Sequence, residues 1–251
     1  MSRMKYYKYR LNPEEENQKD FLLNITKYFS NAENSIHKAR NELKIIPNYG
    51  IETVVKSFKV PNIINQIVYS FFRDSKAKNS YEYSLKIAQF TPKPIGYIEF
   101  YSNYLFKNSY FISEKFDYDF TIREPLLDEN FPDKENIFKL FAQFTLELHN
   151  ANILHNDYSP GNILIKKEGD SYIFKIVDIN RMEFKELNPI QRAENFSKLW
   201  ASDVILQVIV TEYVKNYHTD MKFIEKVLYY SNKHKKIKNL KKRLKGKKIN
   251  V

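Results

Sequence analysis

The feature that most constrains this chain is a cluster of polar side chains, LHNDYSPGNILI at residues 154–165, which leads directly into an apolar run. A proline–glycine pair inside the cluster predicts a turn, because these residue types suit the backbone angles of turns. A second apolar run, FKIV, ends at Asp178. Two such runs joined by the turn residues EGD predict a β-hairpin. Folding this hairpin back would bring Asp178 near Asn162 in the polar cluster.

The side chains gathered in this way are suited to phosphoryl transfer. Asn162 and Asp178 offer an amide and a carboxylate oxygen, and Mg²⁺ prefers hard oxygen ligands and completes its shell with phosphates. Asp157 would remain free to accept the proton of an attacking hydroxyl. Taken alone, Asp157 or Asn162 reads as an ordinary turn residue. Together with Asp178 and an amphipathic helix directly before the cluster, the pattern favours a catalytic loop.

Composition restricts the alternatives. The 251 residues are 43% hydrophobic and 16% aromatic, enough to fill the core of one large domain or of two small lobes that share a cleft. The absence of cysteine excludes disulfides, thiol catalysis and cysteine-ligated zinc, and the five histidines show no metal-ligand spacing. There is no apolar run of bilayer length, and the first residues lack the apolar core of a signal peptide. We therefore expect a cytoplasmic protein.

The net charge of +11 is concentrated at the end of the chain. Residues 221–251 contain twelve Lys and Arg against the single acid Glu225, so the remainder of the chain is neutral. The segment therefore points to an anionic partner of its own, separate from the main body.

Strand and helix signals divide the chain into a strand-rich first part and a helix-rich second part. The expected strands are 35–59 with a turn at 48–50, the antiparallel pair 95–101 and 109–116, and the hairpin after residue 162. The expected helices are 61–90 with Tyr81, Leu85 and Ala88 on one face, 133–150, and most of the chain from about 188. Within 133–150, the apolar residues at helical spacing are Ile137, Leu140, Phe141, Phe144 and Leu148.

These motifs resemble the protein-kinase-like fold, in particular the bacterial lipopolysaccharide kinases that phosphorylate Kdo or heptose in the inner core. HNDYSPGN is similar to the kinase catalytic loop H-x-D-x-x-x-x-N, with His155, Asp157 and Asn162 in register. VDIN stands where the metal-binding D-F-G would be, so that Asp178 matches its aspartate. TVVKSFK looks like the strand with the phosphate-contacting lysine, and SYEYSLKI like the helix whose glutamate pairs with it. The resemblance covers about residues 35–215.

The resemblance implies an α+β fold with two lobes. Residues 1–116 would form a strand-rich, nucleotide-binding N-terminal lobe, and residues 117–220 a helical C-terminal lobe that contains the catalytic-loop hairpin. Residues 221–251 are expected to form a separate, basic and amphipathic tail.

The resemblance also assigns roles in the C-terminal lobe. Asp157 would be the catalytic base, and Asn162 would act both in catalysis and as a ligand of Mg²⁺ beside Asp178. His155 is expected to brace the loop backbone and the metal-binding segment instead of acting as the base. Tyr158 is expected to pack in the core.

In the N-terminal lobe, the resemblance implies an ATP site. Lys56 would contact the phosphates, because Val54 and Lys56 share one face of the expected strand while Lys59 points to the other. Glu82, on the expected helix, would pair with Lys56. A solvated surface pair is the alternative interpretation of these two residues. The adenine would be held by backbone atoms of Glu114 and Phe116 in a hinge.

The chain departs from protein kinases in several places. A G-x-G-x-x-G loop is missing, and no A-P-E segment follows Asp178. Ser159 occupies a position where protein kinases commonly have lysine, and Asn180 replaces the glycine of D-F-G. The missing A-P-E segment and the serine resemble kinases of small molecules and glycolipids more than kinases of proteins.

The function expected from these observations is an ATP- and Mg²⁺-dependent kinase. Its acceptor would be a hydroxyl of a lipid-linked inner-core sugar, Kdo or heptose, at the cytoplasmic face of the inner membrane. One alternative is a non-catalytic, kinase-like membrane scaffold, although the chain keeps all five residues Lys56, Glu82, Asp157, Asn162 and Asp178. Another is a kinase of proteins or of a soluble small molecule.

The basic tail has two interpretations. Its apolar residues recur at mostly helical spacing between lysines and arginines, which is typical of a helix that docks on an anionic membrane. They are Ile224, Val227, Leu228, Ile237, Leu240 and Leu244. The alternative is that this stripe packs on the C-terminal lobe. Nucleic-acid binding is disfavoured, because beyond Tyr229 and Tyr230 the tail has no aromatic residue for base stacking.

Overall fold

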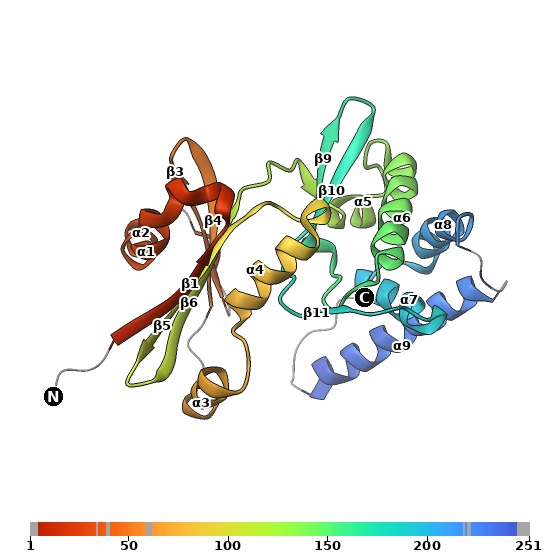
Figure 1. The fold of residues 1–251 in the computed structure, drawn as a ribbon. Coiled ribbons are helices and arrows are strands. Elements are labelled where there is room, and N and C mark those ends of the chain that lie inside the picture. Colours follow the sequence, from red (N-terminus) through yellow and green to blue (C-terminus); the bar gives the residue numbers. More distant parts are fainter. Residues whose placement is uncertain are drawn as a thin grey trace. The chain divides into compact units, whose positions relative to one another are not determined.

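The computed structural model describes residues 5–33, 35–38, 41–58, 62–217, 219 and 222–244, with the backbone alone at 36–38 (Figure 1). The chain forms two compact units, Met1–Phe116 and Asp117–Val251. The first contains a six-stranded sheet with helices on both faces, and the second is mainly helical. This is the mixed α+β architecture that the sequence predicted.

The sheet of the first unit is antiparallel throughout, with the strand order β1-β5-β6-β4-β3-β2. Its strands are β1 (Lys5–Leu11), β2 (Ser35–Lys38), β3 (Glu42–Asn48), β4 (Ile51–Phe58), β5 (Pro94–Ser102) and β6 (Leu105–Glu114). Tyr49 and Gly50, both with positive φ, join β3 to β4 in a two-residue turn. The expected turn at 48–50 and the expected antiparallel pair are thus confirmed; β1 was not predicted.

Helices cover both faces of this sheet (Figure 1). They are α1 (Lys19–Leu23), α2 (Ile25–Asn31), α3 (Ile63–Phe71) and α4 (Lys76–Lys86), with short 3₁₀ turns at Pro13–Gln18 and Ala88–Phe90. Phe21, Leu22 and Ile25 from α1 and α2 pack with Val55 of β4 on one face. Ala77 and Tyr81 of α4 pack with Phe58 and Tyr97 on the other.

The single helix expected over 61–90 is wrong, because the chain forms α3 and α4 with a break between them. Ser75 lies in that break, and its hydroxyl accepts the amide of Lys78, which caps the start of α4. The buried face of α4 carries Ala77, Ser80, Tyr81 and Ser84. Leu85 is exposed, so the stripe expected through it does not form the core contact. Pro61 lies outside the described residues.

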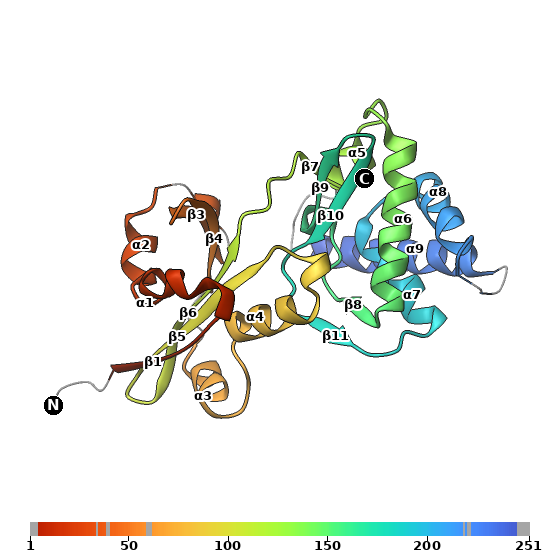
Figure 2. The same ribbon diagram turned by 45° about the horizontal axis from the view of Figure 1, so that its top comes forward.

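The second unit is built around α6 (Lys134–Asn150). The hairpin of β9 (Ile163–Glu168) and β10 (Ser171–Ile176) lies beside it, as Figure 2 shows. Phe144 of α6 stacks on Phe174 of β10, with 5.3 Å between the ring centroids. The predicted apolar face of α6 is confirmed, since Ile137, Phe141, Phe144 and Leu148 are buried and the fifth predicted residue, Leu140, is half-buried.

The remaining elements of the second unit are short strands and helices. The strands are β7 (Phe120–Thr121), which pairs with β9, and β8 (Ile153–His155), which pairs with β11 (Met182–Phe184). The helices are α5 (Arg123–Leu127), α7 (Pro189–Phe196), α8 (Asp203–Val214) and α9 (Phe223–Leu244), with 3₁₀ turns at Pro160–Asn162 and Ser197–Leu199. No helix of the described ranges has a stretch long and apolar enough to cross a membrane.

Helix α9 contains most of the basic tail and belongs to the second unit. Phe223 stacks on Tyr213 of α8, and Val227 is fully buried. Asn232 donates to the carboxylate of Asp203 at 2.9 Å, and Lys235 lies 3.5 Å from the same carboxylate. One side of the helix therefore packs on the lobe, as the second interpretation of the tail proposed.

Candidate active site

The predicted catalytic loop begins with a buried histidine that fixes its backbone. The Nδ1 atom of His155 accepts the amide of Asp157 at 3.1 Å, so the proton of the neutral ring is on Nε2. Nε2 donates to the carbonyl oxygen of Val177 at 2.9 Å. Burial holds the pKa of His155 below its ordinary value, which favours this neutral form. His155 therefore ties the loop to the segment before Asp178, in the structural role that the sequence predicted.

A second pair of hydrogen bonds completes this link. The amide of Val177 donates to the carbonyl of Asn162 at 3.0 Å, while its carbonyl accepts from His155. Both backbone groups of Val177 are thus bonded to the catalytic loop. Because Asp178 is the next residue, it is held close to Asn162. The hairpin turn at 169–170 makes this return possible, as predicted from the EGD sequence.

The carboxylate of Asp157 is left available by this arrangement. The loop around it is held by backbone contacts: Asn162 donates its side-chain amide to the Asp157 carbonyl at 2.8 Å, and the Ser159 amide donates to the same carbonyl at 2.7 Å. Among the described residues, no hydrogen bond or ion pair engages the Asp157 carboxylate. Asp157 is half-buried, so a carboxylate in this position can contact a hydroxyl group and accept its proton.

Asp178 has the left-handed backbone conformation, with φ of 58°. This conformation costs free energy in a residue with a side chain and is concentrated at functional sites. Asn180 donates to one Asp178 carboxylate oxygen at 2.6 Å, which orients the group. Asn180 therefore replaces the glycine of D-F-G with a residue that holds the predicted metal ligand.

The donor set fits Mg²⁺ with phosphate ligands. Asn162 uses its side-chain nitrogen for the Asp157 carbonyl, so its side-chain oxygen faces away from that bond and can bind a cation beside Asp178. The described residues contain no cluster of three His, Cys, Asp or Glu side chains that could hold a metal alone. One carboxylate and one amide oxygen suit an ion that takes its other ligands from water and nucleotide phosphates.

A buried network supports the loop from below. Asn195 of α7 donates to the carbonyl of His155 at 2.9 Å, so its side-chain oxygen accepts Nε2–H of His149 at 3.1 Å. The Tyr213 hydroxyl donates to Nδ1 of His149 at 2.9 Å and accepts from Arg192 at 3.0 Å. Burial, with the nearby guanidinium as a smaller contribution, lowers the pKa of His149 to about 4. The catalytic loop thus rests on α6, α7 and α8.

Tyr158 packs in the core as predicted. It is 1% exposed, its ring stacks on Phe141, and its hydroxyl lies 2.9 Å from that of Thr145.

An arginine that the sequence analysis did not identify lies against the loop. A Cβ atom at Gly161 would be 2.6 Å from Nη2 of Arg123, so the guanidinium packs directly on this glycine. Among the described residues the Arg123 side chain forms no ion pair. A guanidinium there can bind an anionic group beside the loop. In the sequence, the available signal was the glycine at position 161, but a glycine does not show that Arg123 packs against it.

In the first unit, Lys56 and Glu82 lie on one side of the sheet. The ammonium of Lys56 lies 5.4 Å from the ring centre of Phe58, which packs against α4. Lys56 and Phe58 thus share one face of β4, while Lys59 lies outside the described residues. Glu82 of α4 makes long ion pairs, each 3.9 Å, with Arg10 and Lys78. The predicted pair of Glu82 with Lys56 stays a prediction.

The two predicted hinge residues differ in their backbone bonding. The Glu114 amide donates to the carbonyl of Lys93 at 2.9 Å. Phe116 follows β6 as the last residue of the first unit, and its backbone makes no hydrogen bond to the described residues. Of the two, Phe116 has an amide free to bind an adenine ring.

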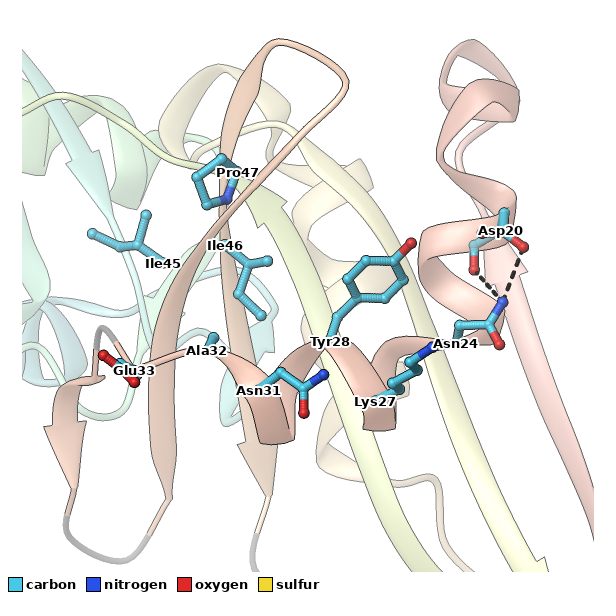
Figure 3. A pocket seen from close by; sticks show the side chains of 10 residues that line it. All are labelled: Asp20, Asn24, Lys27, Tyr28, Asn31, Ala32, Glu33, Ile45, Ile46 and Pro47. Atoms are coloured by element: carbon cyan, nitrogen blue, oxygen red, sulfur yellow. Dashed lines mark hydrogen bonds between the residues drawn. The ribbon is translucent and has the colours of Figure 1, made fainter.

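A hollow of the first unit lies away from the predicted site residues (Figure 3). It has a volume of about 650 Å³ and is lined by α1, α2 and β3. Its side chains include Lys27 and Tyr28, and an Asp20–Asn24 hydrogen bond of 2.9 Å lies at one end. None of the predicted site residues lines it.

Comparison with known proteins supports the fold. No protein-family model and no curated protein matches the chain. The structure is similar to that of WaaP in complex with acyl carrier protein, with a TM-score of 0.61 and 12% identity over 92% of this chain and 99% of that one. Rio2 kinase from Chaetomium thermophilum, in an ADP/Mg²⁺-phosphoaspartate complex, gives a TM-score of 0.49 and 13% identity over 83% and 64%. The similarity to the WaaP structure supports the α+β kinase-like fold that the motifs predicted.

Proposed function

We propose that this protein is an ATP- and Mg²⁺-dependent phosphotransferase that acts on an alcohol group. The observation that carries the proposal is the double hydrogen bonding of Val177 to His155 and Asn162, which holds Asp178 beside the catalytic loop. The same loop leaves the carboxylate of Asp157 available. A metal-binding pair next to a free carboxylate is the arrangement that phosphoryl transfer requires.

Each residue has a role in this proposal. Asp157 orients the acceptor hydroxyl and takes its proton, while Asn162 and Asp178 hold Mg²⁺, which would neutralise phosphate charge when bound. Lys56, paired with Glu82, contacts the nucleotide phosphates, and the backbone of Glu114 and Phe116 holds the adenine. Arg123 adds a positive charge at Gly161, where it can contact an anionic acceptor.

We further propose that the acceptor is a Kdo or heptose residue of lipid-linked lipopolysaccharide at the cytoplasmic membrane face. The resemblance of the motifs to the lipopolysaccharide kinases and the similarity of fold to WaaP support this substrate class. The test compares the masses of lipopolysaccharide and lipid A from cells with and without the gene. Loss of one phosphate supports the assignment. Unchanged masses, together with ATP-dependent phosphorylation of a protein or a soluble small molecule by the pure enzyme, would contradict it.

A non-catalytic scaffold is the alternative from a different class. Its discriminating measurement is binding of ATP with Mg²⁺ by the pure protein, followed calorimetrically. If the pure protein binds no ATP, the scaffold is favoured, and the two hydrogen bonds of Val177 have no role in catalysis.

Since the WaaP structure contains acyl carrier protein, we also propose to test whether acyl carrier protein purifies with this chain.

We propose that the second half of α9 docks on an anionic membrane. The six apolar residues expected on one stripe lie on two sides of the helix: Val227 is buried against the lobe, whereas Ile237, Leu240 and Leu244 are exposed. Lys233, Lys236 and Lys241 lie among the exposed ones. Each basic side chain near an anionic leaflet contributes about 1 kcal/mol to binding.

Deleting the whole helix would not test this docking, because it would uncover the aromatic core around Phe223. The variant Leu240→Asp changes only the exposed side. In sedimentation with vesicles that contain acidic lipid, it should pellet less than the parent, and the parent should be released as salt rises. Equal pelleting of the two proteins would contradict docking through α9.

A further inference from the structure

Helix α3 of the first unit turns its apolar side to the solvent. No charged residue occurs between Asn62 and Phe72, and the exposed side carries five large apolar side chains. They are Ile63, Ile64, Ile67, Phe71 and the adjoining Phe72, each between 42% and 81% exposed. The first four recur at the three- and four-residue spacing of one helical face. Such a contiguous apolar surface marks a site of interaction.

The polar side of α3 faces the protein instead. Gln66 is buried, and its side-chain oxygen accepts the ammonium of Lys107 on β6 at 3.0 Å. The Ser70 hydroxyl donates to the Gln66 carbonyl at 2.6 Å and accepts the amide of Phe106 at 2.8 Å. These hydrogen bonds fix which way the helix faces, so burying the isoleucines against the sheet would break them. The hydrogen bonds of Gln66 and Ser70 therefore hold the apolar stripe at the surface of the protein.

Basic side chains lie at the C-terminal end of this stripe. Arg73 follows the helix and lies over the ring of Tyr69, with 5.8 Å to the ring centre. Lys8 and Arg73 line a hollow of about 370 Å³ that also includes Phe71. Asp74, an acid next to the helix, is paired with Lys78 at 2.7 Å. An apolar stripe with cations at its border matches the chemistry of an anionic lipid surface.

We propose that α3 inserts its isoleucine and phenylalanine side chains into an anionic membrane surface, as an attachment of the first unit separate from α9. Lys8 and Arg73 contact lipid phosphates at the headgroup level. The helix lies in the plane of the interface, because its nine residues are too few to span a bilayer. The proposal does not depend on catalysis, so its test contains no nucleotide and no acceptor.

The experiment measures partition of the full chain onto vesicles of phosphatidylcholine and phosphatidylglycerol by sedimentation. Ile67→Asp places a charge in the middle of the stripe and should lower the partition coefficient about tenfold, the equivalent of one buried aliphatic side chain. Asn65→Asp is the matched control: it adds the same charge to the same helix, on an exposed position outside the stripe. It should stay within about twofold of the parent.

Measuring the effect of Ile67→Asp in a chain that also carries Leu240→Asp separates vesicle binding through α3 from vesicle binding through α9. A further loss on adding Ile67→Asp supports two attachments. Equal partition with and without Ile67→Asp, in both backgrounds, overturns the proposal.

Light scattering without lipid provides a second measurement. If the parent is a dimer and becomes a monomer on Ile67→Asp, the stripe joins two copies of the chain, and this result also overturns the membrane assignment. Unchanged circular dichroism of both α3 variants shows that they fold.

Discussion

The catalytic loop of the second unit and the lysine–glutamate region of the first differ in how firmly their residues are placed. Around Asp157 and Asp178, hydrogen bonds from His155, Asn162 and Val177 connect the loop, the hairpin and the predicted metal-binding segment. Lys56 and Glu82 lie on the same side of their sheet, but Glu82 pairs with Arg10 and Lys78. The half of the candidate site around Asp157 is thus preorganised, whereas for the half around Lys56 the ion pair with Glu82 stays a prediction.

The largest expected effect tests the preorganised half. Asp157→Asn should lower the rate of phosphoryl transfer about a thousandfold, because the acceptor hydroxyl loses its base. Binding of ATP and Mg²⁺, measured calorimetrically, should stay nearly intact. Asp178→Asn should weaken nucleotide binding as well, because it removes a metal ligand. Equal single-turnover rates for Asp157→Asn and the parent would remove Asp157 from its role.

The buried network beneath the loop predicts a pH dependence of stability. The pKa of His149 is lowered from 6.5 to about 4, so between these values the unfolded chain binds a proton that the folded protein does not. Stability is therefore full above pH 6.5 and falls as the pH decreases towards 4, by about 3 kcal/mol from this group.

Urea unfolding of the parent and of His149→Gln, at neutral pH and at about pH 4, measures this contribution. The parent should lose more stability on acidification than the variant, because glutamine does not titrate. The same loss in both proteins would show that carboxylates, and not His149, set the acid sensitivity.

The third prediction concerns the first unit. Lys56→Met should lower the transfer rate about a hundredfold, because a cation on the nucleotide phosphates is lost. Lys59→Ala should have little effect, since this residue is expected on the opposite face of the strand. If Lys59→Ala were the more damaging change, the strand register assigned to the phosphate contact would be wrong by one position.

The smallest expected effect concerns Arg123. Gly161→Ala would place a Cβ 2.6 Å from Nη2 of Arg123, and the flexible end of that side chain can move aside. Stability should change by less than about 0.5 kcal/mol. The kcat/KM for an anionic acceptor should fall about threefold as the guanidinium shifts. Arg123→Gln should lower it at least as much; unchanged kcat/KM in both variants would show that Arg123 has no part in acceptor binding.

Sequence alone determined the features that depend on near neighbours along the chain. The hairpin after Asn162, the turn at 48–50 and the apolar face of α6 follow from local turn residues and periodicity, and the structure confirms them. The H-x-D-x-x-x-x-N spacing likewise identified the loop that contains Asp157. These signals are readable because the contacting residues lie within one or two adjacent elements.

Tertiary structure decided what depends on partners distant in sequence. Periodicity shows that a helix has an apolar side but not whether another element covers that side. It therefore predicted a single apolar stripe in the tail, whereas the apolar residues of α9 lie on a buried side and on an exposed side. For the same reason it could not show that α3 buries Gln66 and exposes Ile67. Arg123 reaches Gly161 across 38 positions of sequence, and no local pattern records that contact. Burial is set by which surfaces meet in the folded chain, and that choice is non-local.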